Sequence, residues 1–166
     1  SHKWQWHNVT TPYRTTIHVI NSAVVKLSKL TKAAKVYRGV SGGRLPSTFR
    51  KENAWGVRGG VEGGFMSTTT NRDVAIEYAA GGIALVFEIR QGMVDRGADI
   101  SRISQYPHEK EIRFAPLAGM EVVETRVAHT PKGPVLIVDT RININLQALT
   151  IEEVLSKRRK LIREVC

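Results

Sequence analysis

Apolar residues near the N-terminus recur at the spacing of an amphipathic helix. They follow one another at steps of 4, 3, 4 and 3 residues: Tyr13, Ile17, Ile20, Val24 and Leu27. This spacing places them on one face of a helix. Thr11 can cap the helix, and Pro12 suits its first position. We therefore predict a helix over residues 11–34 that packs this face on the body of the domain.

Short β-type runs dominate the middle of the chain. The predicted strands cover residues 35–40, 65–69, 83–90, 109–115, 120–127 and 135–144. Residues 41–64 are rich in glycine, and we expect them to be mostly irregular, with a short helix near residues 50–55. Asn71 or Thr70 can cap a helix that continues through Ala80. The short turns between the last three strands are typical of antiparallel pairing.

The end of the chain predicts another helix. Thr150 and Glu153 have the spacing of a capping box, and a run of four basic residues at 157–160 follows. We expect residues 1–149 to form one domain and residues 150–166 to form a basic helix, either an extension or a linker. The order of the elements is not a strand–helix alternation, and GxGxxG is absent, which disfavours a Rossmann dinucleotide fold.

The net charge raises the question of nucleic acid binding. The chain has 166 residues and a formal net charge of +10, and its first 51 residues carry ten Lys and Arg and no acidic residue. The basic residues are dispersed without interleaved aromatic residues, so a solvated basic helix explains them better than a nucleic-acid partner does. No apolar run approaches the length of about 18 residues that a membrane helix needs.

The cysteine and histidine content argues against disulfides and metals. Cys166 is the single cysteine, so an internal disulfide and a cysteine-based zinc site are impossible. The five histidines lack ligand spacing such as HExxH, and we expect no metal. The N-terminal residues lack the basic-then-apolar order of a signal peptide. These features favour an intracellular location over an extracellular one, but they do not identify the location.

Two stretches contain residues suited to anion or ligand binding. Arg38 lies inside an otherwise apolar strand, where its permanent charge needs an anion. Alternatively, it reaches solvent from a strand end. Gly39 follows, and a glycine in a strand lets a ligand approach the backbone. The second stretch runs from Ser67 to Thr70 and offers four consecutive hydroxyls. Such runs are also common in loops and helix caps.

The third stretch carries two carboxylates. Residues two apart in a strand share a face, so Glu109, Glu111 and Arg113 are predicted on one face. Ile112 and Phe114 fall on the other face. The two glutamates repel one another unless a cation or a substrate lies between them. A solvated strand edge is the alternative reading.

In chain order, the three stretches resemble a known motif set. Tyr-Arg-Gly at 37–39, Phe-x-Ser-Thr-Thr at 65–69 and Tyr-Pro-x-Glu-x-Glu at 106–111 are similar to the motifs of the Arg–Ser–Glu class of mono-ADP-ribosyltransferases. This class includes vertebrate ecto-enzymes and bacterial toxins. The resemblance implies an α+β fold, with two small crossed β-sheets and flanking helices around an NAD cleft. It also implies transfer of ADP-ribose from NAD to arginine side chains, with release of nicotinamide and no metal.

The resemblance implies a role for each matched residue. Glu111 is the catalytic residue, which stabilises a transition state resembling an oxocarbenium ion. Ser67 holds Glu111 by a hydrogen bond. Arg38 clamps the pyrophosphate, and the backbone of Gly39 holds the nicotinamide amide. Glu109 binds the incoming guanidinium and helps to remove its proton, which implies an arginine acceptor.

Further matches concern the NAD site and the protein substrate. Thr68 and Thr69 complete the hydroxyl motif, with Thr69 in place of its last serine, and we expect both to bind NAD. Arg72 follows them and is a candidate phosphate ligand. Residues 71–82 lie where the class has its phosphate–nicotinamide loop. The segment from Ser101 to His108 matches the loop that contacts the protein substrate.

Two rival functions stay open at this point. One is an NAD glycohydrolase on the same fold, in which water replaces the protein acceptor. The other is a degenerate module that binds NAD or nucleic acid without catalysis. The oligomeric state is also open.

Overall fold

The computed structural model describes residues 13–54, 56–80, 84–131 and 133–144. Helices and strands alternate irregularly along these ranges. In chain order the elements are α1 (Arg14–Ser28), β1 (Lys35–Val40), α2 (Ser47–Arg50), β2 (Gly59–Glu62), β3 (Met66–Thr69), α3 (Arg72–Ala79), β4 (Ala84–Arg90), β5 (Ala98–Asp99), the 3-10 turn η1 (Pro107–Glu109), β6 (Glu111–Phe114), β7 (Ala118–Thr130) and β8 (Gly133–Ile144).

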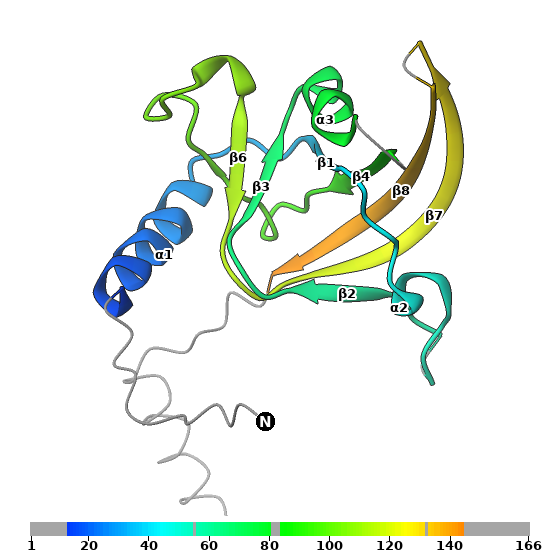
Figure 1. The fold of residues 1–166 in the computed structure, drawn as a ribbon. Helices are drawn as coiled ribbons and strands as arrows, with labels where there is room; N and C mark the ends of the chain where they lie inside the picture. The colour runs from blue at the N-terminus through cyan, green and yellow to red at the C-terminus, as the bar shows by residue number, and fades with distance from the viewer. Residues whose placement is uncertain (1–12, 55, 81–83, 132, 145–166) are drawn as a thin grey trace, which may run out of the picture.

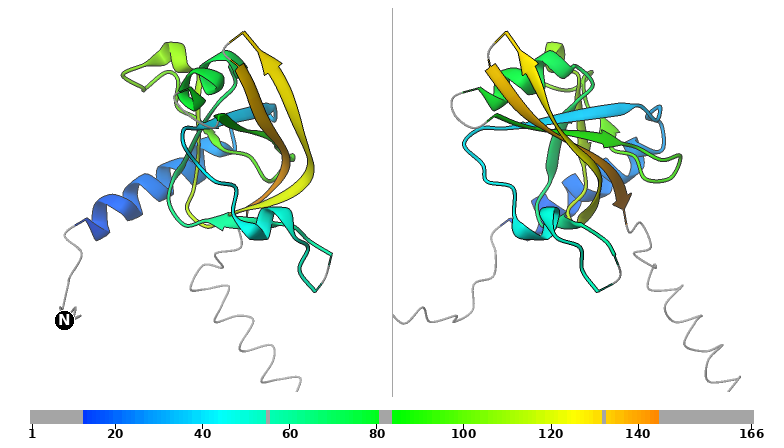
Figure 2. Two further views of the ribbon diagram at one scale, coloured as in Figure 1. Left: turned by 45° about the vertical axis from the view of Figure 1, so that its right-hand side comes forward. Right: turned by 90° about the vertical axis from the view of Figure 1, so that its right-hand side faces the viewer.

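The strands form one strongly curved sheet in the order β2-β7-β8-β4-β1-β3-β6-β5 (Figure 1). The β4–β8 pair is parallel, and the other pairs are antiparallel. Both views in Figure 2 show β7 and β8 as a long curved hairpin. The α+β class is confirmed. The two expected sheets are the halves of this sheet, and they are joined through Tyr37 of β1 and Thr69 of β3.

The strands alternate between two apolar clusters, one on each face of the sheet. In β4, Phe87 and Ile89 belong to the larger cluster, which also contains Phe114 and Met66. Val86 points to the other face and packs in the smaller cluster beneath α3. This alternation is the period-two pattern of a strand that is buried on both faces.

The predicted N-terminal helix is shorter and less buried than its pattern indicates. Helix α1 ends at Ser28, and its first described turn begins at Arg14. Val24 is buried, but Ile17 and Ile20 are exposed. The reason is that α1 contacts β5, a strand of two residues, which is too short to cover the whole apolar face of the helix. Thr11 and Pro12 lie outside the described residues.

Three further expectations are corrected or untested. The glycine-rich stretch contains β2, and its short helix is α2, which begins at Ser47 and ends at Arg50. β6 and β7 do not pair with each other: β6 pairs with β3 and β5, and β7 pairs with β2 and β8. The turn between them directs the chain toward β2, because the amide of Leu117, at φ 66°, donates to the carbonyl of Glu62. The predicted helix over residues 150–166 lies outside the described residues.

No helix in the described ranges has both the length and the apolar content that are needed to span a membrane.

Helix α3 packs on β1 at Gly39. A Cβ built on this glycine would lie 1.9 Å from the carbonyl oxygen of Ala75 and 2.9 Å from the amide nitrogen of Ala79. Any side chain at position 39 would therefore push the helix away from the sheet. The asparagine cap is as predicted: the Asn71 side chain accepts a hydrogen bond from the amide of Asp73 at 3.0 Å. The start of α3 and its distance from β1 are both set by single residues.

This close approach predicts that Gly39→Ala destabilises the domain. The added methyl overlaps helix backbone, which cannot rotate aside as a side chain can, so we expect a loss of about 3 kcal/mol in the free energy of unfolding. Denaturant unfolding measures this loss. Gly63→Ala is the matched control, because a Cβ there meets open space. Equal stability of the two variants would show that α3 does not press on β1.

Candidate functional site

A pocket of about 320 Å³ lies where β1 and β3 cross beneath α3. Four parts of the chain contribute to its wall: β1, β3, α3 and the η1–β6 segment. The lining residues are Tyr37, Arg38, Gly39, Phe65, Ser67, Thr68, Thr69, Val74, Ala75, Tyr78, Glu109 and Glu111. The three stretches that the sequence singled out therefore meet in one cavity.

Glu111 is the most enclosed acid of this pocket. Its exposed fraction is 9%, and the hydroxyl of Ser67 donates to its Oε1. The guanidinium of Arg113 lies 2.7 Å from the same oxygen. The prediction that Glu111 and Arg113 share a strand face is confirmed, and Ile112 and Phe114 are buried on the other face. The carboxylate is thus held by two partners at one oxygen while it still borders the cavity.

Glu109 does not share that strand face, and this expectation was wrong. The residue ends the 3-10 turn η1, and Lys110 follows in the left-handed region with φ 47°. The left-handed residue breaks the strand alternation between positions 109 and 111. Glu109 nevertheless lines the same pocket as Glu111. The two carboxylates reach the cavity from a turn and from a strand.

Tyr78 on α3 binds the Glu109 carboxylate. Its hydroxyl donates to Oε1 of Glu109 at 2.6 Å. This hydrogen bond and the negative charge of Glu109 raise the pKa of Tyr78 above its ordinary value of 10.0, with a smaller contribution from Glu111. The phenol is therefore a protonated donor at neutral pH. The side chain of Tyr78 thus links α3 to the turn that carries Glu109.

The hydroxyls of Thr68 and Thr69 hold the wall of the pocket together. Thr68 Oγ1 donates to the carbonyl of Ile112 at 2.7 Å. Thr69 Oγ1 donates to the carbonyl of Glu109 at 2.6 Å and accepts from the amide of Asn71 at 2.9 Å. Both residues line the pocket, and their NAD-binding role stays a prediction. Their observed bonds fix the turn that presents Glu109.

Arg38 has the anion that its place in an apolar strand demands. Its Nη2 atom lies 3.3 Å from a carboxylate oxygen of Glu62 on β2. Both side chains are about one-third exposed, at 30% and 31%. Arg38 also lines the pocket, so a second anion within the cavity can compete with Glu62 for the guanidinium. The predicted pyrophosphate role of Arg38 fits this placement but stays a prediction.

Arg72 binds a buried carboxylate outside the pocket, that of Glu88. Its Nε donates to the buried carboxylate of Glu88 at 3.3 Å, and Lys35 and Arg126 bind the same carboxylate. Burial alone would raise the pKa of Glu88. The hydrogen bond and charge of Arg126, with the charge of Lys35, outweigh burial and lower it. Arg72 is not among the pocket-lining residues, and its phosphate role stays a prediction.

The two loops implied by the resemblance differ in form. Residues 72–79 of the expected phosphate–nicotinamide loop form α3, which roofs the pocket with Val74, Ala75 and Tyr78. The segment from Ser101 to His108 lies at the surface, and Ile103 is 75% exposed. The segment ends next to Glu109, which lines the pocket. Its contact with a protein substrate stays a prediction.

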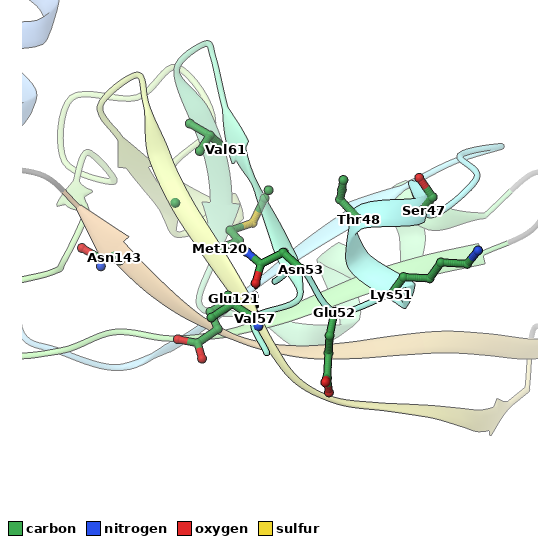
Figure 3. Close-up of a pocket in the computed structure, with 13 residues that line it drawn as sticks. Ser47, Thr48, Lys51, Glu52, Asn53, Val57, Val61, Met120, Glu121 and Asn143 are labelled. Atoms are coloured by element: carbon green, nitrogen blue, oxygen red, sulfur yellow. Dashed lines mark hydrogen bonds between the residues drawn. The ribbon is translucent and has the colours of Figure 1, made fainter. Parts of the chain in front are cut away.

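A larger pocket, of about 660 Å³, lies away from these residues, between α2 and the β2–β7 edge of the sheet. Figure 3 shows its charged side chains, Lys51, Glu52 and Glu121, spread around it rather than directed at one point. No arginine is among its described lining residues, and its hydroxyls, on Ser47 and Thr48, lie on α2 rather than next to a buried carboxylate as Ser67 does in the smaller pocket. The smaller pocket is therefore the candidate functional site.

Three partners of the site residues escaped the sequence interpretation. Tyr78 lies on the pocket side of α3, and the position of this tyrosine one turn after Val74 was an available signal. Arg113 was placed beside Glu111 but given no role. Glu62 pairs with Arg38 across 24 positions of the chain, and no local pattern points to that pair. In the described part of the chain, no group of three or more His, Cys, Asp or Glu could hold a metal ion.

Comparison with known proteins gives a family match and several similar structures. The sequence model of the family described as NAD:arginine ADP-ribosyltransferase matches residues 2–136. No curated protein matches the sequence significantly. The ADP-ribosyltransferase HopU1 of Pseudomonas syringae pv. Tomato DC3000 is 26% identical, with a TM-score of 0.60, over 82% of this chain and 60% of that chain.

Two further structures share the fold. The ADP-ribosyltransferase Vis, a toxin from Vibrio splendidus, is 25% identical with a TM-score of 0.54, over 82% of this chain and 59% of its own. Exoenzyme S from Pseudomonas aeruginosa, solved with human 14-3-3 protein beta and carba-NAD, is 20% identical with a TM-score of 0.56, over 90% of this chain and 70% of its own. The chain thus spans about 60% of the length of the first two.

Proposed function

The chain belongs to the NAD:arginine ADP-ribosyltransferase family, and on that premise we propose that it transfers ADP-ribose from NAD to arginine side chains of a protein. Nicotinamide is released. The observation that carries the proposal is the meeting of Arg38, Ser67, Glu109 and Glu111 in one pocket. Because the chain spans only part of the similar structures, this activity is a proposal for the described domain.

The reaction replaces one bond to the anomeric carbon of the ribose with another. The bond between that carbon and the nicotinamide nitrogen breaks, and its electron pair leaves with nicotinamide. The ribose then carries positive charge, as in glycoside hydrolysis. A guanidinium nitrogen of the acceptor donates a pair to the same carbon and loses a proton. The protein has to stabilise the positive charge and to accept that proton.

Glu111 is suited to the first task. A preorganised carboxylate stabilises positive charge as it develops, because the carboxylate does not have to reorient. The hydroxyl of Ser67 and the guanidinium of Arg113 hold Glu111 in that orientation. Ser67 and Arg113 are therefore positioning residues in this proposal, and Glu111 is the catalytic residue.

Glu109 is suited to the second task. It borders the pocket without occupying the same strand face as Glu111, so the two acids can serve different groups. A carboxylate binds a guanidinium through charge-assisted hydrogen bonds and can take its proton. The presence of this second acid favours transfer to arginine over hydrolysis.

Arg38 is suited to the pyrophosphate of NAD. Its planar fork matches the oxygens of a phosphate pair. In the structure its partner is the carboxylate of Glu62, which is about one-third exposed. Binding of NAD then exchanges one anion for another at Arg38, which leaves no buried charge unpaired. In this proposal the backbone of Gly39, which also lines the pocket, holds the nicotinamide amide.

The direct test is incubation of the protein with NAD alone and with NAD plus agmatine, a small guanidinium acceptor. We expect nicotinamide release in both reactions and ADP-ribosyl-agmatine in the second. Nicotinamide release without any modified agmatine would favour the NAD glycohydrolase. No cleavage of NAD in either reaction would contradict the proposal.

Glu111→Gln should abolish both transfer and hydrolysis. The amide keeps the shape of the side chain but loses the charge that the transition state needs. We expect the rate of nicotinamide release to fall by about 10²–10³. Glu121→Gln, in the other pocket, is the matched control and should keep its activity. Near-normal turnover by a folded Glu111→Gln variant would show that another group stabilises the ribose.

Arg38→Lys should weaken NAD binding. A point charge cannot reproduce the two-point contact of a guanidinium, and we expect the dissociation constant to rise about tenfold, or about 1.4 kcal/mol. Calorimetry measures the affinity. Arg44→Lys, on an exposed loop outside the pocket, is the control. An unchanged dissociation constant for Arg38→Lys would mean that Arg38 serves the ion pair with Glu62 alone.

Glu109→Gln should separate transfer from hydrolysis. The variant loses the charge that binds the guanidinium and accepts its proton, so the ratio of modified agmatine to nicotinamide released in water should fall about 10²-fold. Both products can be followed in one reaction, with the exposed Glu52→Gln as control. A parallel fall of both activities would assign Glu109 to NAD binding, and no fall in either would remove the arginine-acceptor claim.

A further inference from the structure

The contact between Tyr78 and Glu109 forms a wall between two cavities. The candidate site lies on one side. On the other side lies an outer pocket of about 240 Å³, lined by Val74, Glu77, Tyr78, His108 and Glu109. The two cavities share Val74, Tyr78 and Glu109. An acceptor that enters through the outer pocket therefore meets this contact before it reaches the candidate site.

Tyr78 and Glu109 differ in how firmly the surrounding chain holds their backbone. Tyr78 lies in α3, whose backbone presses against β1 at Gly39. Glu109 ends a short turn in which the side chains of its neighbours, Pro107 and His108, are exposed. The hydrogen bond from the Thr69 hydroxyl to the carbonyl of Glu109 fixes the backbone of this residue. The hydrogen bond from the Tyr78 hydroxyl fixes the position of its carboxylate.

We propose that Tyr78 is the positioning residue for the acceptor: its hydroxyl holds Glu109 between the two cavities, with one carboxylate oxygen left to bind the arriving guanidinium. This inference rests on the proposed transferase function and adds a residue that determines its specificity. The hydroxyl occupies Oε1, so Oε2 remains for the acceptor. Glu77 adds negative charge to the outer pocket, which suits a cation.

The protonation of Tyr78 is compatible with this task. Its raised pKa means that the folded protein keeps the phenol protonated at pH values where a free tyrosine begins to ionise. The stabilisation from the bond is complete below the ordinary pKa of 10.0 and is lost as the pH rises through the raised value. The hydroxyl is thus a protonated donor throughout the neutral pH range.

Tyr78→Phe tests the hydroxyl while it keeps the ring. We expect the ratio of modified agmatine to nicotinamide released in water to fall about fivefold, mainly through a higher KM for agmatine, because a hydrogen bond to a charged group is lost. Tyr13→Phe, at an exposed position before α1, is the matched control and should leave the ratio unchanged.

A double-mutant cycle separates positioning from a general structural effect. If Tyr78 acts through Glu109, adding Tyr78→Phe to Glu109→Gln should change the ratio no further. A merely structural role would lower both activities by the same factor in either background. An unchanged ratio in Tyr78→Phe, or full additivity with Glu109→Gln, overturns the inference.

A second measurement tests the inference even if the Tyr78→Phe variant folds poorly. In the wild type, the Tyr78 phenol should titrate above an ordinary tyrosine by NMR of labelled rings, and Glu109→Gln should remove most of that difference. If Glu109→Gln leaves the titration of the Tyr78 phenol unaltered, the hydrogen bond between Tyr78 and Glu109 is absent in solution.

The failure of this inference can be told apart from the failure of the proposed function. If the wild type does not cleave NAD at all, the proposed function fails. If the wild type is active and Tyr78→Phe leaves the ratio unchanged, only this inference fails.

Discussion

The crossing of β1 and β3 is the constraint on which the pocket depends. The two halves of the sheet are joined there through Tyr37 and Thr69, and they diverge from this pair. Divergence brings Arg38 and Ser67 to the same cavity from different strands. Helix α3 can cover the opening because Gly39 lets its backbone lie directly on β1. A tighter crossing would close the cavity, and a side chain at position 39 would lift its roof.

The acids around this crossing each have a separate partner. Glu111 is held by Ser67 and Arg113, and Glu109 by Tyr78. Neighbouring carboxylates repel one another, so distinct partners on β3, β6 and α3 are what allow two of them to border one cavity. The arrangement suits a reaction with two charge requirements, one at the ribose and one at the acceptor.

The parts of the fold that depend on local signals were predictable. The Asn71 cap, the strand at Lys35–Val40 and the inward Ile112 and Phe114 all agree with the structure. The resemblance gave the family, because its three motifs stand in order along the chain. The convergence of these motifs in one cavity follows from the fold that the family implies.

What escaped prediction depends on a local backbone conformation without a sequence signal and on contacts between distant segments. Glu109 left the strand because Lys110 adopts a left-handed backbone that is unusual for a lysine. The exposed half of α1 reflects the length of β5, a strand of two residues without a recognisable pattern. The pairs Arg38–Glu62 and Tyr78–Glu109 join residues 24 and 31 positions apart. Spacing within one element cannot reveal such pairs.

A crystal structure of the Glu111→Gln variant with NAD tests the central claim most directly, because the variant should bind NAD without consuming it. The account predicts the nicotinamide-bearing ribose beside Ser67 and position 111, with the pyrophosphate on Arg38 in place of Glu62. NAD bound instead between α2 and the β2–β7 edge, or Arg38 still paired with Glu62 in a crystal saturated with NAD, would contradict it.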